Sequence, residues 1–546
     1  MMRETVPPLL DISGLSVAFG AHEVVRDVSF SVGAGEAVGL VGESGSGKSI
    51  TCRAVLGLLP RAARASGQVL FDGADLLALS PAEMQLVRGR KISMIFQNPS
   101  SHLDPLMTAG AQVAEPLRRH LGQPRRTALG HAVEILRSVR INEPERRLHA
   151  YPHELSGGMK QRVLIGSAMA CGPRLLLADE PTTALDVTVQ ARILELMREL
   201  NHARGVSILL VSHDLGVVAE MCSRVVVMRN GAVVEDGPAR DILRAPKHPY
   251  TQLLIESQPA VLPLPAVSRA EASDAAPLVE VKRLSVEFFR PGLLPGRRKD
   301  VVKAVDDVSF DVRPGENFAI VGESGSGKST IARVVMGLER PVAGEVLYRG
   351  RPVASLDADG MKAFRRKAQM IFQNPFDSLN PAIRVADAIA EPLIRHGLLG
   401  RAAARARALD LMGQVELPEA LAERRPGQLS GGQCQRVGIA RALALDPELV
   451  IADEITSALD VTIQAQILRL LDRLRTERGL TVITISHDLH VVRRFCDRVA
   501  VLRAGRLVET GPVEEVLTSP REDYTRDLVR SAPRLDLALE REAAEA

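Results

Sequence analysis

The sequence GESGSGKS occurs twice in this chain, once in each half. A glycine-rich loop between a strand and a helix turns backbone N–H groups inward, and the positive end of the helix dipole adds to their attraction for phosphate. Lys48 and Lys328 stand where a lysine reaches the β- and γ-phosphates of a nucleotide. Ser49 and Ser329 follow them and offer a hydroxyl to Mg²⁺. One copy alone could be an ordinary turn, but two copies followed by matching motifs predict two phosphate-binding sites.

An aspartate–glutamate pair follows an unbroken apolar run in each half, as Asp179–Glu180 after LLLA and Asp453–Glu454 after LVIA. Such runs are typical of buried parallel strands, and open α/β sheets place ligands at the carboxyl ends of their strands. The aspartate can hold Mg²⁺ through water, and the glutamate can polarise an attacking water. An isolated pair is usually surface charge, so its repetition at the end of a buried strand is what indicates chemistry.

A glutamine and a histidine recur at the ends of further apolar runs. Gln97 and Gln373 lie in FQNP segments, where a glutamine can touch the metal and orient water, although such a residue is by itself more often part of a turn. His213 and His487 end the runs SILLVSHD and TVITISHD. An isolated histidine there is more often structural, and only the neighbouring motifs favour a γ-phosphate contact.

The sequence LSGG also appears in both halves, with its serine at Ser156 and Ser430. Serine is a good N-cap, and the glycines allow close approach to the positive end of the helix that follows. The motif predicts a second anion site in each half, whereas a single copy would be explained by an ordinary capped helix.

The halves repeat one fold with small insertions, since 453 − 179 and 487 − 213 both equal 274. With 546 residues the chain exceeds a single core. We expect α/β domains at 1–258 and 278–533, an Ala/Pro-rich linker at 259–277 and a charged tail at 534–546. The segment 290–300 is expected to be an exposed insertion loop.

Composition excludes several classes of function. Lysine and arginine (69) nearly balance aspartate and glutamate (66), and aromatic residues make up 3%, so neither charge nor stacking favours nucleic acid. No run approaches the ~20 apolar residues of a membrane span, and the first ten residues lack the apolar core of a signal peptide. We therefore expect a soluble cytoplasmic protein without a membrane span. The five cysteines show no metal-ligand spacing.

Taken in order, the loop, Gln, LSGG, Asp-Glu, TALD or SALD turn and His resemble the nucleotide-binding domains of ATP-binding cassette proteins, over nearly the whole chain. The resemblance implies two tandem P-loop NTPase domains, each with a RecA-like core, an antiparallel β subdomain and a helical subdomain. It also implies an intramolecular head-to-tail dimer in which the LSGG helix of one domain completes the site of the other, with ATP and Mg²⁺ as cofactors.

Carried onto this sequence, the resemblance gives each site a set of residues. The ATP-binding set is Phe19, Gly42, Glu43, Ser44, Gly45, Ser46, Gly47, Lys48, Ser49, Ile50, Ser156, Gly157 and Gly158 in the first half, and Phe288, Gly322, Glu323, Ser324, Gly325, Ser326, Gly327, Lys328, Ser329, Thr330, Ser430, Gly431 and Gly432 in the second. The catalytic set is Glu180, Glu454, His213, His487, Gln97 and Gln373; the Mg²⁺ set is Ser49, Gln97, Asp179, Ser329, Gln373 and Asp453.

Some details of the resemblance stay open or depart from the pattern. The second adenine-stacking aromatic is Phe288 or its neighbour Phe289. Asp186 and Asp460 match the turn that crosses the dimer interface, and Ile455 replaces the proline of the first half, for which we expect a small effect on loop stiffness.

The segment PKHPYTQLLIESQP is similar to the ATPase subunits of dipeptide, oligopeptide and nickel importers, and a weaker version, SPREDYTRDLVRSAP, lies near the end of the chain. The resemblance implies an ATPase on the cytoplasmic face of the inner membrane, with two transmembrane permease subunits and an extracytoplasmic solute-binding protein as partners. Alternatives are a soluble tandem cassette protein acting on ribosomes or DNA, and an exporter ATPase. Dipeptide, longer peptide, glutathione, opine and nickel all remain possible cargo.

Overall fold

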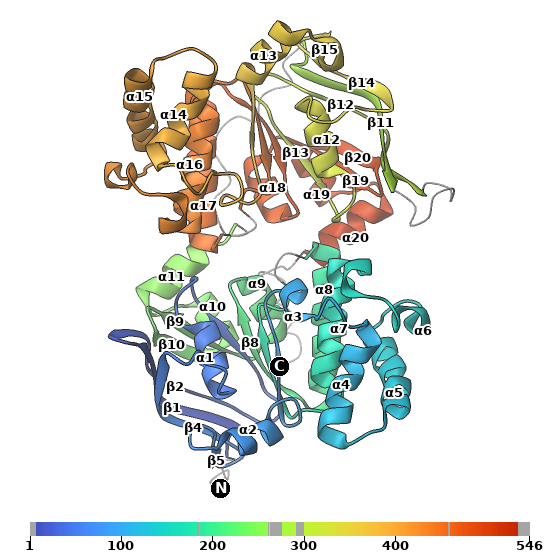
Figure 1. The fold of residues 1–546 in the computed structure, drawn as a ribbon, viewed down its shortest axis with the longest axis vertical. Coiled ribbons are helices and arrows are strands. Elements are labelled where there is room, and N and C mark those ends of the chain that lie inside the picture. Colours follow the sequence, from blue (N-terminus) through green and yellow to red (C-terminus); the bar gives the residue numbers. More distant parts are fainter. Residues whose placement is uncertain are drawn as a thin grey trace. The chain divides into compact units, whose positions relative to one another are not determined.

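The computed structural model describes residues 7–182, 185–259, 261, 276–290, 300–456 and 459–532. The chain forms two compact units, one within residues 1–258 and the other largely within 259–532. Most of the expected linker at 259–277, the insertion at 291–299 and the expected tail at 534–546 lie outside the described residues. Each unit combines an antiparallel sheet, a six-stranded sheet and helices (Figure 1).

The antiparallel sheet of each unit has the same strand order. In the first unit the order is β2-β1-β4-β5, and in the second it is β12-β11-β14-β15. The strands of the first are β1 (Leu10–Phe19), β2 (His22–Val32), β4 (Ala63–Phe71) and β5 (Ala74–Asp75); those of the second are β11 (Val279–Arg290), β12 (Asp300–Val312), β14 (Ala343–Tyr348) and β15 (Arg351–Pro352). Buried residues tend to alternate with exposed ones along β1 and β2, as expected for a sheet with one covered face.

The six-stranded sheet carries the sequence motifs. Its strands in the first unit are β3 (Ala37–Val41), β6 (Ile92–Ile95), β7 (Leu175–Asp179), β8 (Ser207–Ser212), β9 (Arg224–Arg229) and β10 (Ala232–Pro238). The second unit has β13 (Asn317–Gly322), β16 (Ala368–Ile371), β17 (Leu449–Asp453), β18 (Thr481–Ile485), β19 (Arg498–Arg503) and β20 (Arg506–Pro512). The strand before each glycine-rich loop, β3 or β13, lies between two parallel neighbours. The loop therefore lies at the same sheet edge as the residues that follow the neighbouring strands.

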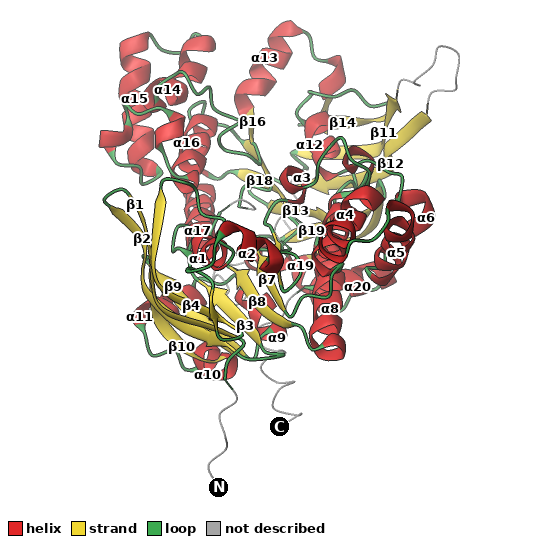
Figure 2. Cartoon of the chain, turned by 60° about the horizontal axis from the view of Figure 1, so that its bottom comes forward, coloured by secondary structure: helices red, strands yellow, loops and turns green. Residues whose placement is uncertain are grey.

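Helices fill the rest of each unit, and α4, α5 and α6 form a group apart from the antiparallel sheet of the same unit (Figures 1 and 2). The first half contains α1 (Lys48–Val55), α2 (Pro81–Val87), α3 (Pro99–His102), α4 (Ala109–Leu121), α5 (Arg125–Ser138), α6 (Pro144–Arg147), α7 (Gly157–Met169), α8 (Val187–Arg204), α9 (Leu215–Met221), α10 (Ala239–Arg244) and α11 (Pro249–Glu256). The second contains α12 (Lys328–Val335), α13 (Ala358–Lys367), α14 (Val385–Arg395), α15 (Arg401–Gln414), α16 (Gly431–Leu443), α17 (Val461–Arg478), α18 (Leu489–Phe495), α19 (Val513–Thr518) and α20 (Asp523–Ser531). The predicted α/β fold with antiparallel and helical parts is confirmed.

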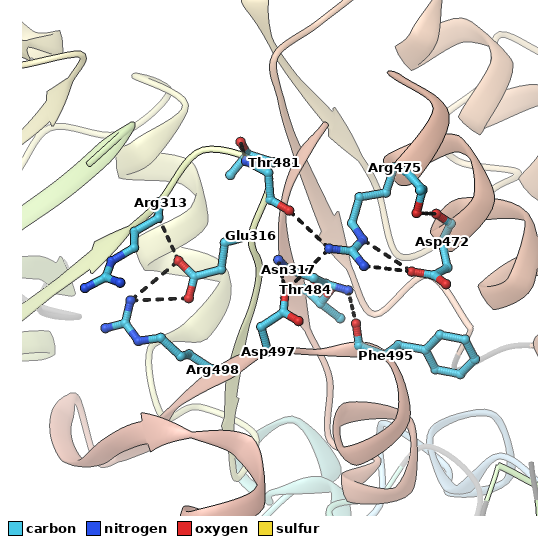
Figure 3. Close-up of polar contacts among 12 residues, drawn as sticks. Arg313, Glu316, Asn317, Asp472, Arg475, Thr481, Thr484, Phe495, Asp497 and Arg498 are labelled. Atoms are coloured by element: carbon cyan, nitrogen blue, oxygen red, sulfur yellow. Dashed lines mark hydrogen bonds and ion pairs between the residues drawn. The ribbon is translucent and has the colours of Figure 1, made fainter. Parts of the chain in front are cut away.

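The two units share topology but differ in the polarity of one sheet edge. Strand β13 begins at Asn317, whose backbone N–H donates to Asp497 Oδ2 at 2.8 Å, and Thr484 Oγ1 donates to Asn317 Oδ1 at 2.8 Å (Figure 3). The corresponding positions in the first unit are the buried apolar residues Ala37 and Leu210. The start of the second P-loop strand is therefore fixed by a polar network, which the motif analysis did not predict.

Candidate active sites

The P-loops, residues 42–49 and 322–329, contain glycines at positions where any larger side chain would clash with the backbone or strain it. Gly42 has φ 149°, and a Cβ there would lie 2.2 Å from the carbonyl oxygen of Met228. Gly47, at φ 99°, is the N-cap of α1. Gly322 repeats the first case, with 2.1 Å to the carbonyl oxygen of Leu502. A side chain at these positions would require backbone movement, so the loops depend on glycine for their backbone path.

Each P-loop lysine is buried and folded over its own loop. Lys48 Nζ donates to the carbonyl oxygens of Gly42 and Glu43, both at 2.8 Å. Lys328 Nζ makes the corresponding bonds to Gly322 and Glu323 at 2.8 and 2.9 Å, and burial lowers its pKa. The ammonium group is thus held at the mouth of the loop, where a phosphate oxygen could replace a carbonyl as its partner.

A hydroxyl and a carboxylate meet beside each P-loop. Ser49 Oγ donates to Asp179 Oδ1 at 2.9 Å, and Ser329 Oγ donates to Asp453 Oδ1 at 3.2 Å. Burial raises the pKa of both carboxyl groups. Two hard oxygen donors next to a phosphate loop are the ligand type that Mg²⁺ prefers, so these residues fit the ion.

The raised pKa of Asp179 predicts a stability effect. A carboxyl whose pKa is higher in the folded than in the unfolded state stabilises the fold most at low pH, and this stability is lost as pH rises through the folded pKa. At neutral pH Asp179→Asn keeps an oxygen to accept from Ser49 but removes a buried charge. Without nucleotide, we expect the melting temperature at pH 7 to rise by about 1–4 °C, and the difference to vanish below about pH 4. A melting temperature at pH 7 equal to or below wild type would contradict this.

The glutamate after each buried strand lies between the predicted glutamine and histidine. Gln97 Nε2 donates to Glu180 Oε2 at 2.7 Å, and His213 Nδ1 lies 3.4 Å from Glu180 Oε1. The second unit repeats this at Glu454, with 2.7 Å to Gln373 and 3.6 Å to His487. The structure therefore brings the predicted catalytic residues of each half together at the carboxyl end of the sheet.

Both glutamates adopt a backbone conformation that favours glycine. Glu180 has φ 47° and Glu454 has φ 46°, in the left-handed region. Burial acts to raise the pKa of Glu454, but the contact with His487 and the charge of Lys328 together lower it. For His487, burial acts to lower the pKa and the Glu454 carboxylate raises it. Strained backbone and a coupled acid–base pair at one place are typical of a reaction site.

The LSGG motifs begin helices as predicted. Ser156 Oγ accepts a hydrogen bond from the backbone N–H of Met159 at 3.3 Å. A Cβ on Gly158 would lie 2.5 Å from Val189 of α8, and the second unit repeats this distance between Gly432 and Ile463 of α17. The last glycine is therefore required for packing against the next helix. In both units the LSGG residues thus form the start of their own helix, α7 or α16.

The remaining predicted residues lie at the ends of strands and helices. Phe19 ends β1 and is half-buried, and Phe288 on β11 is 38% exposed, while the side chain of Phe289 is outside the described part. Asp460 stands at the start of α17. Ile455 is buried, so this apolar residue fills a covered position.

The sequence motifs did not predict one contact that is present at each P-loop. Tyr250 Oη accepts a hydrogen bond from the backbone N–H of Glu43 at 2.9 Å, and Tyr524 Oη makes the longer equivalent contact with Glu323 at 3.4 Å. Their equal spacing, 524 − 250 = 274, was the available sequence indication. It did not reveal that the tyrosines reach the P-loops.

Comparisons with known proteins match both halves. The ABC transporter family model matches residues 25–183 and 305–457, and the model for the oligopeptide/dipeptide transporter C-terminal region matches 234–277 and 508–545. The glutathione import ATP-binding protein GsiA of Escherichia coli K12 is 42% identical over 96% of this chain and 89% of its own length. GsiA of Salmonella typhimurium LT2 is 42% identical over 97% and 90%. A solved dimeric ATP-binding cassette with ADP and Pi is 34% identical, covers 43% of this chain and 98% of its own, and has a TM-score of 0.39. The chain belongs to the ABC transporter family and is an ATP-binding, ATP-hydrolysing member of it.

Proposed function

We propose that this protein is the ATPase subunit of an importer for peptides or related small solutes. The observation that supports it best is the duplicated pairing of an ABC transporter match with an oligopeptide/dipeptide transporter C-terminal match. The glutathione import proteins are 42% identical over 96% of this chain and 89% of their own length, so the similarity spans both halves. Glutathione is itself a small peptide-like solute, so relatives and C-terminal segments agree on the class of cargo.

Two composite ATP sites, one per P-loop, form part of this proposal. One combines Lys48, Gln97, Asp179, Glu180 and His213 with Ser430 and Gly432; the other combines Lys328, Gln373, Asp453, Glu454 and His487 with Ser156 and Gly158. The support is that each unit brings together its own glutamine, glutamate and histidine, and that its LSGG serine caps a separate helix. The proposed domain limits are 1–258 and 278–533.

Within each site the side chains have distinct roles. Lys48 would hold phosphate oxygens, and Ser49, Gln97 and Asp179 would hold Mg²⁺, which supplies charge neutralisation when bound. Glu180 takes a proton from water that Gln97 orients, and a left-handed backbone fixes its position. His213, 3.4 Å from Glu180 Oε1, keeps the carboxylate oriented and would contact the γ-phosphate.

The proposed partners are two transmembrane permease subunits and an extracytoplasmic solute-binding protein, with this chain on the cytoplasmic face of the inner membrane. In the described part of the chain, no helix has the length and hydropathy needed to cross a bilayer. The segment after Gln97, including Leu106 with 85% of its surface exposed, is the proposed docking region in the first unit.

Reconstitution tests the importer function directly. The chain is co-purified with its permeases, placed in liposomes with the binding protein, and offered a dipeptide, a longer peptide, glutathione and Ni²⁺ in turn. We expect one class of solute to accumulate and to stimulate ATP hydrolysis, and Lys48→Ala to abolish accumulation. Co-sedimentation with ribosomes and no membrane partner would instead favour the rival class of soluble cassette proteins.

A further inference from the structure

A tyrosine from the C-terminal helix of each unit touches the first peptide of the P-loop. Tyr250 on α11 is 2% exposed and accepts from Glu43 N at 2.9 Å; Tyr524 on α20 is 8% exposed and lies 3.4 Å from Glu323 N. The contact therefore occurs twice, between elements about 200 residues apart (250 − 43 = 207, and 524 − 323 = 201).

The tyrosines are themselves held in place. The guanidinium of Arg229, the last residue of β9, lies 4.8 Å from the centre of the Tyr250 ring, and Arg503 at the end of β19 lies 4.8 Å from the Tyr524 ring. At this distance a cation is attracted to the ring face. Burial, followed by the nearby Glu323 carboxylate, raises the pKa of Tyr524 to about 12, so this phenol stays neutral at physiological pH.

The start of each C-terminal helix is also tied to the neighbouring strand. Glu235 on β10 accepts from the backbone N–H groups of Lys247 at 2.8 Å and His248 at 3.1 Å. Glu509 on β20 accepts in the same way from Arg521 and Glu522, at 3.0 and 3.3 Å. These hydrogen bonds fix the start of each helix, and the helix in turn holds the tyrosine hydroxyl against the P-loop.

The start of the first P-loop is consequently held by two contacts, one from a backbone carbonyl and one from the tyrosine hydroxyl. The carbonyl oxygen of Met228 packs so closely on Gly42 that a Cβ there would lie 2.2 Å away, and Tyr250 holds the next residue, Glu43. Glu43 also supplies one of the carbonyls that hold Lys48 Nζ, at 2.8 Å. A shift of the Glu43 backbone would therefore also move a carbonyl oxygen that binds Lys48 Nζ.

We propose that Tyr250 and Tyr524 are positioning residues for nucleotide binding, which fix the entrance of each P-loop and couple it to the C-terminal helix of the same unit. Both helices lie within the segments that match the oligopeptide/dipeptide transporter C-terminal region, so that region contributes to the support of the nucleotide site. This inference requires ATP binding only and does not depend on the solute or partners proposed above.

Tyr250→Phe in the full-length chain tests the proposal because it removes only the hydroxyl. With ATP and a chelator to prevent turnover, we expect the Kd of the first site to rise about 3- to 10-fold, as for loss of one neutral hydrogen bond. Tyr524→Phe should have a smaller effect, since its contact is longer. To report on individual sites, affinity is measured in chains where the other site carries Lys328→Ala or Lys48→Ala.

Tyr348→Phe is the matched control. Tyr348, the last residue of β14, lies outside the sequence motifs, and its Oη donates to Glu448 Oε2 at 2.9 Å. Loss of this hydrogen bond should lower the melting temperature without changing the Kd for ATP. An ATP Kd within twofold of wild type in Tyr250→Phe, or an equal change in Tyr348→Phe, would overturn the proposal.

Hydrogen exchange on the unsubstituted chain gives a second test. Coupling is reciprocal, so ATP should slow amide exchange in α11 of the wild-type protein, and this slowing should be lost in Tyr250→Phe. If ATP leaves exchange in α11 of the wild-type protein unchanged, the helix and the P-loop are not coupled and the proposal fails.

Discussion

Replacing Glu180 and Glu454 together with glutamine is expected to lower ATP turnover by about 10²- to 10⁴-fold while leaving ATP bound. Glutamine has the same shape and can still meet Gln97 and Gln373, but it cannot take a proton from water. Lys48 Nζ keeps its hydrogen bonds to the carbonyl oxygens of Gly42 and Glu43 in this variant, so binding should survive. Steady-state hydrolysis and retention of labelled ATP after gel filtration measure the two effects separately.

A surface substitution controls for the loss of negative charge. Glu195 pairs with Arg140 on an exposed face, so Glu195→Gln should hydrolyse ATP at the wild-type rate. Rapid turnover by the Glu180→Gln, Glu454→Gln protein would show that neither glutamate is the base.

Pairs of substitutions should reveal which residues share a site. In the Glu180→Gln, Glu454→Gln background, Lys48→Ala with Ser430→Ala damages one proposed composite site twice, whereas Lys48→Ala with Ser156→Ala damages both. If each closed site retains one nucleotide, the first pair should hold about one ATP per chain and the second almost none. The parent double mutant, with both sites intact, should hold about two.

Each pair is the control of the other, since both carry one lysine and one serine replacement. The single Ser156→Ala and Ser430→Ala variants show how much each serine contributes alone. The opposite order would mean that each LSGG serine serves the site of its own half, and equal retention would mean that neither serine belongs to one site more than to the other. Either result would make the head-to-tail proposal wrong.

Short motifs made much of each site predictable because their chemistry is local. The glycine-rich loop before Lys48 leads directly into α1 through Gly47, and Ser156 caps the helix that it precedes. Apolar runs ending in Asp179 and Asp453 likewise predicted buried strands with carboxylates at their ends, and both strands are fully buried.

Contacts between distant segments needed the folded chain. The left-handed backbone of Glu180, with Gln97 on one carboxylate oxygen and His213 near the other, follows from the positions of three neighbouring strands. The hydroxyl of Tyr250 on Glu43 depends on how β9 and β10 return the chain to the P-loop.

By itself the sequence determined the α/β fold class, the twofold repeat and the residue types of both nucleotide sites. Only the tertiary structure decided which side chains meet, including the polar start of β13 around Asn317 and the tyrosine support of both P-loops. The physical reason is that backbone conformation and helix capping depend on adjacent residues, whereas hydrogen bonds across the sheet depend on strand order and crossover, which no local pattern specifies.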